Sequence, residues 1–229
     1  MEKRFKRFFI GLCLLSVCIL SFLRINYPDY YLPLKMAASF SFVMTAFFAF
    51  LSNKKKSAKF KKMGIGFIIA SFISFVADFV IDVNFLYGML LFFISVLVYF
   101  FSCFNFGLPN KTFYLVTFGT YIPFIVIINL LPGFKFENFT IPVAVYSFTI
   151  LIFTVKSFGV FRNKSVYAKM LPIGALLFII SDFDLLIKVF YQLSPNVKLL
   201  YEMTNPILYF PAQLLIANSL SKDFFEDKN

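Results

Sequence analysis

Long apolar runs alternate with short polar connections along this chain. The runs are continuous over about 20 residues, which predicts α-helices long enough to cross a bilayer and excludes a β-barrel, whose strands alternate apolar and polar positions. The predicted helices span approximately residues 7–24, 35–52, 63–82, 85–105, 112–131, 139–157, 171–191 and 199–220. Because the connections are too short for a soluble domain, the pattern predicts an all-α polytopic membrane protein with a bundle of eight transmembrane helices, forming a single transmembrane domain over residues 1–229.

The first apolar run follows a basic segment, as the core of a secretory signal peptide does. No small-residue cleavage site follows FFIGLCLLSVCILSF. Instead the chain continues as LRINYPDYY, and tyrosines are common at membrane interfaces. We therefore interpret this run as the first transmembrane helix.

Basic residues predict the orientation. Most of the 22 Lys and Arg residues lie on alternate connections, with dense clusters at the N-terminus, in the loop NKKKSAKFKK and over residues 156–169. Cytoplasmic connections of membrane proteins are enriched in Lys and Arg, and an even number of helices returns the chain to its starting side. We expect both termini in the cytoplasm, and the protein in the inner membrane if its host is bacterial.

Composition narrows the possible chemistry. The chain is 60% hydrophobic and only 14% charged, which a soluble domain of this size could not bury. The net charge of +11 lies in short clusters between apolar runs rather than on one face, so nucleic acid is not an expected partner. Histidine is absent and the three cysteines lack metal-ligand spacing, so we expect no metal and no cofactor. Chemistry must then use carboxylates, hydroxyls, amides and lysine.

Several carboxylates lie inside the apolar runs. Asp78 and Asp182 fall in the middle to outer half of the third and seventh helices, and Asp82 shares a helix face with Asp78. Asp182 and Asp184 are two residues apart and point about 200° apart, so they cannot face one pocket. Lys188 follows Asp184 by four residues, the spacing and order of a helical ion pair. Asp182 is left without a partner in its own helix.

Buried carboxylates can simply hold helices together, and Asp184 with Lys188 fits that structural role. An isolated ionisable group at mid-membrane costs several kcal/mol and usually marks a site or a proton pathway. A desolvated carboxyl group near a second carboxylate also favours one protonated acid beside one ionised partner. Asp78 and Asp182 are therefore the candidate acid/base pair.

The chain also resembles the YhhN-like family of multi-pass membrane proteins, which includes lysoplasmalogenase. The resemblance lies in five motifs in the family's order: SFVADFVI, YGMLLFFISVLVY, IPVAVYSFTI, GALLFIISDFDLL and LYFPAQLLIANSL. Two positions depart from the family pattern: Ala77 replaces a glycine, and Ser95 lies near the place of a common histidine. Any proton shuttle or hydrogen bond that this histidine provides in relatives must be made by other groups here or be missing.

The resemblance implies hydrolysis of the vinyl ether bond of a lysoplasmalogen, giving a fatty aldehyde and a glycerophospho-head group. Either Asp78 or Asp182 would be the general acid and the other the stabiliser or base. The partners are a lipid substrate and the bilayer. The expected substrate-binding residues are Asp82, Asn84, Tyr146, Ser181, Lys188, Asn205, Tyr209 and Gln213. Among them, we expect Tyr146, Tyr209 and Gln213 to hold water or the glycerol hydroxyl, and Asp82, Asn84 and Lys188 to meet the phosphate.

Two other functions stay open at this point. Buried aspartates also serve as proton relays, so the chain could be a small transporter or a proton-coupled carrier. It could also be an inactive family member that binds lipid. The sequence predicts neither the head-group and chain preference nor the oligomeric state.

Overall fold

The computed structural model describes residues 1–26, 30–54, 56–104, 106, 110–161 and 163–225, and this part of the chain is helical with no strand. Its α-helices each overlap one of the predicted ranges. They are α1 (Glu2–Asn26), α2 (Tyr31–Ser52), α3 (Ala58–Val83), α4 (Phe85–Ser102), α5 (Asn110–Leu130), α6 (Thr140–Ser157), α7 (Val166–Phe190) and α8 (Pro195–Asn218). Short 3-10 turns flank α6 and follow α8.

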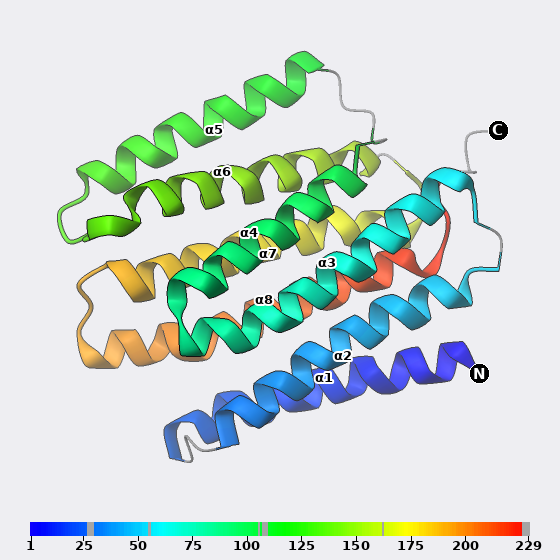
Figure 1. Cartoon of the computed structure of the whole chain (residues 1–229), viewed down its shortest axis with the longest axis horizontal. Coiled ribbons are helices and arrows are strands. Elements are labelled where there is room, and N and C mark those ends of the chain that lie inside the picture. The colour runs from blue at the N-terminus through cyan, green and yellow to red at the C-terminus, as the bar shows by residue number, and fades with distance from the viewer. Residues whose placement is uncertain (27–29, 55, 105, 107–109, 162, 226–229) are drawn as a thin grey trace.

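Consecutive helices run antiparallel, so that α1 begins and α8 ends at the same end of the bundle (Figure 1). The closest packing joins α1 to α2, α3 to α4 and α7 to α8. Helix α8 is central, because it also contacts α1, α2 and α3. Helix α5 packs mainly on α6 and forms one edge of the bundle (Figure 1).

Six helices, α2 to α7, are long and apolar enough to cross a membrane. Helix α1 opens with a basic segment, and α8 carries Lys198, Glu202, Asn205 and Gln213 among its apolar residues. The polar positions separate α8 from these six helices by composition, whereas the side chains of residues 21–26 at the end of α1 lie outside the described part of the chain. The described part of the chain is therefore all-helical with six candidate spans, and eight spans with cytoplasmic termini stay a prediction.

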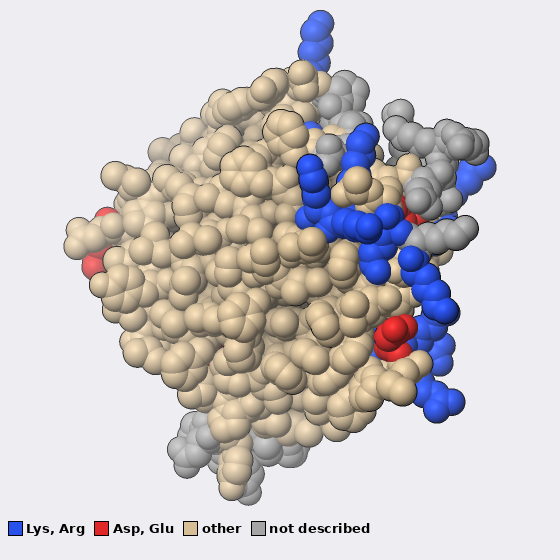
Figure 2. All heavy atoms as spheres, turned by 45° about the vertical axis from the view of Figure 1, so that its right-hand side comes forward, with Lys and Arg blue, Asp and Glu red and all other residues tan. Residues whose placement is uncertain are grey.

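Charge is distributed unevenly along the bundle. Figure 2 shows Lys and Arg gathered at one end of the molecule, the end at which α1 begins. This is the asymmetry from which the orientation is predicted. Three of the basic residues in the predicted cytoplasmic segments, Lys55, Arg162 and Lys228, lie outside the described residues.

One residue joins α3 to α4. The Asn84 N–H donates to the carbonyl of Val80, 2.7 Å away, which ends α3. Its side-chain oxygen accepts from the N–H of Tyr87 at 3.1 Å, which caps the start of α4. So short a connection places the start of α4 directly beside the end of α3. Gly88 of α4 packs against the backbone of α3 at Ile81.

Replacing this glycine tests the packing. A Cβ atom at residue 88 would lie 2.4 Å from the Cα of Ile81, so Gly88→Ala should force α3 and α4 apart. We expect a loss of about 1–3 kcal/mol, the usual cost of overpacking. The measurement is thermal unfolding of the purified protein in detergent. Gly119→Ala is the matched control, because Gly119 has open space around it and alanine favours a helix; equal melting temperatures for the two variants would contradict this packing.

Candidate functional site

A cavity of about 500 Å³ lies in the half of the bundle opposite the basic end. Residues from α2 to α8 line it. Tyr31 at the start of α2, Asp82 near the end of α3, Phe85 at the start of α4 and Phe190 at the end of α7 mark its outer part. Both candidate catalytic aspartates, Asp78 and Asp182, are in its wall.

Asp78 is buried and held by two hydroxyl groups. Ser39 of α2 donates to its Oδ2 atom at 2.6 Å, and Tyr209 of α8 donates to the same atom at 3.0 Å. The ring of Tyr209 is in turn held edge-on by Phe42 and Phe92. Three helices therefore converge on one carboxyl group, whose orientation is fixed by packing as well as by hydrogen bonds.

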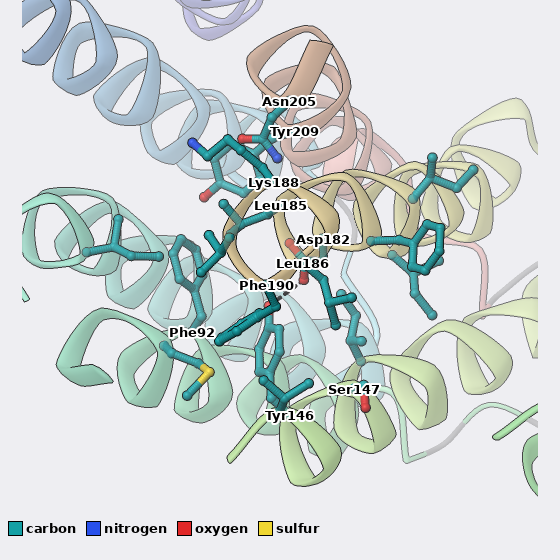
Figure 3. Close-up of a pocket in the computed structure, with 18 of the residues that line it drawn as sticks. Phe92, Tyr146, Ser147, Asp182, Leu185, Leu186, Lys188, Phe190, Asn205 and Tyr209 are labelled. Carbon is teal, nitrogen blue, oxygen red and sulfur yellow. Dashed lines mark hydrogen bonds between the residues drawn. The ribbon is translucent and has the colours of Figure 1, made fainter. Parts of the chain in front are cut away.

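Asp182 faces the same cavity from α7. Tyr146 of α6 points toward it and donates a hydrogen bond to its Oδ2 atom (Figure 3). Asp78 and Asp182 therefore face one cavity from different helices. Beside them, the Asn205 side-chain amide donates to the carbonyl of Ser181 at 2.7 Å, which ties α8 to α7.

Lys35 is a cation in this site that is absent from the predicted set. It belongs to α2, is only 7% exposed, lines the cavity and forms an ion pair with Asp82 at 2.9 Å. The signal that could have found it is the spacing of Lys35 and Ser39, which places both on one face of α2.

The structure brings most of the predicted site residues together. Those that line the cavity are Asp78, Asp82, Tyr146, Asp182, Lys188, Asn205 and Tyr209. Asn84, Ser181 and Gln213 do not line it.

Each of these three has another environment. Asn84 is exposed and caps α4. Ser181 is fully buried and donates to the carbonyl of Phe178 in its own helix at 2.8 Å. Gln213 lies one turn beyond Tyr209, where its Oε1 atom accepts from the Tyr99 hydroxyl at 3.1 Å. We therefore propose no substrate contact for these three side chains.

Asp184 points away from the cavity, as the two-residue spacing from Asp182 predicts. Thr204 of α8 donates to both of its carboxylate oxygens at 3.1 Å. Lys188, the expected ion-pair partner of Asp184, lines the cavity. The Asp184–Lys188 pair stays a prediction, whereas the bond from Thr204 gives Asp184 a structural role between α7 and α8.

The cavity has a polar part and an apolar arm. The charged side chains lie on α2, α3 and α7, together with the hydroxyl groups of Tyr146 and Tyr209. The arm lies where α5, α6 and α7 approach one another, and its wall includes Phe124, Leu151 and Ile180. Such a space suits a molecule with a polar head and a hydrocarbon chain.

The YhhN family model matches residues 30–220. The chain belongs to the YhhN family. Searches of curated proteins and of solved structures find no match. Together with the six apolar helices, membership of this family establishes an integral multi-pass membrane protein.

The ion pair at the cavity gives a stability prediction. Asp82→Asn removes the charge beside Lys35, whose ammonium group is nearly inaccessible to water, whereas Asp82 itself is partly exposed. Leaving a buried charge without its partner should cost roughly 2 kcal/mol.

The double variant Lys35→Met/Asp82→Asn should recover part of this loss, because no buried charge is then left unpaired. Thermal unfolding of the wild type, both single variants and the double variant in detergent measures the coupling. Strictly additive losses would contradict the pairing.

Proposed function

We propose that this chain is a lysoplasmalogenase-like membrane hydrolase, which cleaves the vinyl ether bond of a lysoplasmalogen. The observation that carries the proposal is the pair Asp78 and Asp182, on separate helices, in the wall of one cavity. Tyrosine hydroxyl groups hold both carboxyl groups in place. Membership of the YhhN family fits this activity.

The two parts of the cavity support a lipid substrate. The apolar arm would take the hydrocarbon chain, and Ile180 and Phe183 at the arm are about 44% exposed, so the chain could enter from the lipid side. The polar part would take the glycerophospho-head group. Lys35 and Lys188 both line that part, and either ammonium group could meet the phosphate.

The proposed reaction begins with proton transfer to the vinyl ether. The carboxylic acid gives its proton to the β-carbon, which forms a C–H bond and leaves a positively charged oxocarbenium group. A neighbouring carboxylate stabilises this cation, as in glycosidases. Water then adds to the cationic carbon and returns a proton to the first carboxylate. The resulting hemiacetal breaks its C–O bond to give the fatty aldehyde and the glycerol hydroxyl.

The hydrogen bonds favour one assignment of the two roles. Asp78 accepts from both Ser39 and Tyr209, and Lys35, one turn before Ser39 on α2, lines the same cavity. Donors and a nearby cation favour the ionised form of a carboxyl group. Asp182 accepts from Tyr146 alone among the described side chains. We therefore assign Asp182 as the general acid and Asp78 as the carboxylate that stabilises the cation.

Substitution of either aspartate tests the proposed function. Asp182→Asn and Asp78→Asn should each lower aldehyde release from a lysoplasmalogen by about 10²–10⁴-fold, the usual contribution of an acid/base group. The measurement is aldehyde production by protein purified in detergent, with thermal unfolding to verify folding.

Asp184→Asn is the matched control, because this neighbouring carboxyl group lies outside the cavity and contacts Thr204. Wild-type rates in folded Asp78→Asn and Asp182→Asn variants would exclude the mechanism. Binding of lysoplasmalogen by the wild type without any aldehyde release would instead favour an inactive lipid-binding protein.

Chemical rescue tests which aspartate is the acid. Asp182→Ala leaves space for a small carboxylic acid, so aldehyde release in this variant should rise with the concentration of undissociated formic acid in the buffer. Release by Asp78→Ala should instead rise with the concentration of the formate anion, because the stabilising role needs the ionised form. The opposite dependence in the two variants would reverse the assignment.

A further inference from the structure

A second cavity, of about 320 Å³, lies at the opposite end of the bundle from the proposed active site. Four segments that are far apart in the sequence form it: the start of α1, the end of α2, the start of α7 and the turn after α8. It is lined by Lys3, Lys6, Arg7, Ser52, Asn53, Tyr167, Ser221 and Lys222. We call it the basic pocket.

We propose that the basic pocket binds the phosphate group of an anionic membrane phospholipid. Among the described residues that line it, four carry a positive charge and none carries a negative charge. Lys3, Lys6 and Arg7 lie within one helical turn, so their like charges repel one another unless an anion lies between them. A phosphate oxygen accepts hydrogen bonds from both lysine and arginine.

Lys6 is held in place as part of the pocket wall. Its ammonium group donates to Asn218 Oδ1 and to Ser221 Oγ, both at 2.9 Å, and lies 5.7 Å from the centre of the Tyr167 ring. These contacts fix a positive charge between α1, α7 and α8. A preorganised cation loses less side-chain freedom on binding an anion than an exposed one does.

A second observation points to a ligand. Asn53 lines the pocket, and its side-chain nitrogen is buried with no hydrogen-bond partner among the described residues. A buried donor without a partner is costly, and a small rotation of this side chain toward a phosphate oxygen in the pocket would satisfy it. Asp223, beside Lys222 in sequence, does not line the pocket and accepts from the backbone N–H groups of Ser57 and Phe225.

The surroundings favour a lipid over a free phosphate ion. Phe5 and Phe8, on the same turn of α1 as the cations, expose their rings, and Leu15 further along α1 is also exposed. Cations beside exposed apolar groups are typical of the membrane interface, where a head group and its acyl chains lie together. All four cations lie outside residues 30–220, so family membership does not predict this pocket.

The test compares lipid binding by matched variants of the full chain. Lys3→Gln/Arg7→Gln removes two pocket charges from exposed side chains and leaves the hydrogen bonds of Lys6 intact. Lys61→Gln/Lys62→Gln is the control, because it removes two exposed charges that do not line the pocket. Thermal unfolding verifies that both variants are folded.

The purified proteins are titrated in detergent with short-chain phosphatidylglycerol, short-chain phosphatidylcholine and inorganic phosphate. We expect the wild type to prefer phosphatidylglycerol. The pocket variant should lose about tenfold or more in affinity, since each cation near an anionic lipid contributes on the order of 1 kcal/mol. The control should lose less than about threefold.

Two outcomes would overturn the proposal. Equal affinities of the pocket variant and the control would show that the attraction is a general property of the basic end. Binding of inorganic phosphate as tight as that of phosphatidylglycerol would assign the pocket to a free anion. Neither outcome depends on aldehyde release, so the basic pocket and the proposed hydrolase activity can fail separately.

Discussion

A carboxyl group buried inside a helical bundle must find its hydrogen-bond donors within the protein. At Asp78 this requirement determines how the helices around the cavity pack. Asp78 is only 3% exposed, so an unpaired carboxyl would be costly there. Ser39 and Tyr209 supply the donors, which fixes α2 and α8 against α3 at this level. The central position of α8, which contacts α1, α2, α3 and α7, brings Tyr209 to that place.

The same requirement applies to the buried polar groups one to two turns from Asp78 toward the basic end, which we call the floor of the cavity. One turn from Asp78, Ser74 pairs with Ser95 at 2.7 Å, and Ser95 also donates to the carbonyl of Ala70. A turn further on, the Tyr99 hydroxyl contacts both Ser71 and Gln213. The hydroxyl groups and the Gln213 oxygen are paired in this way, whereas the Gln213 side-chain nitrogen has no hydrogen-bond partner among the described residues.

This arrangement shows whether the site depends on residue 95, which is Ser95 here. The family resemblance places a common histidine near this position, and its absence left open whether other groups replace its proton shuttle or hydrogen bond. In the structure, Ser95 is fully buried in the floor and does not line the cavity. The donors to the two aspartates are Ser39, Tyr146 and Tyr209, so their hydrogen bonds do not depend on residue 95.

The sequence was sufficient where local geometry decides the outcome. Helix ranges follow from the length of each apolar run, and the two-residue spacing of Asp182 and Asp184 predicts that they point apart. It was insufficient where a partner comes from another helix, because no local pattern shows that Lys35 meets Asp82. Gln213 shares a helix face with Tyr209 but lies one turn deeper, where Tyr99 from α4 occupies its oxygen.

Helix α5 shows how the site can combine a fixed polar part with an adaptable chain-binding part. Of its residues only Thr117 and Ile128 are buried, although Thr120, Tyr121 and Phe124 line the apolar arm. The Tyr121 hydroxyl donates to the carbonyl of Ala144, which attaches α5 to α6. A helix with so few buried residues can shift at low cost. Because α2, α3, α6, α7 and α8 carry the aspartates and their donors, such a shift would change the width of the arm without moving the carboxyl groups.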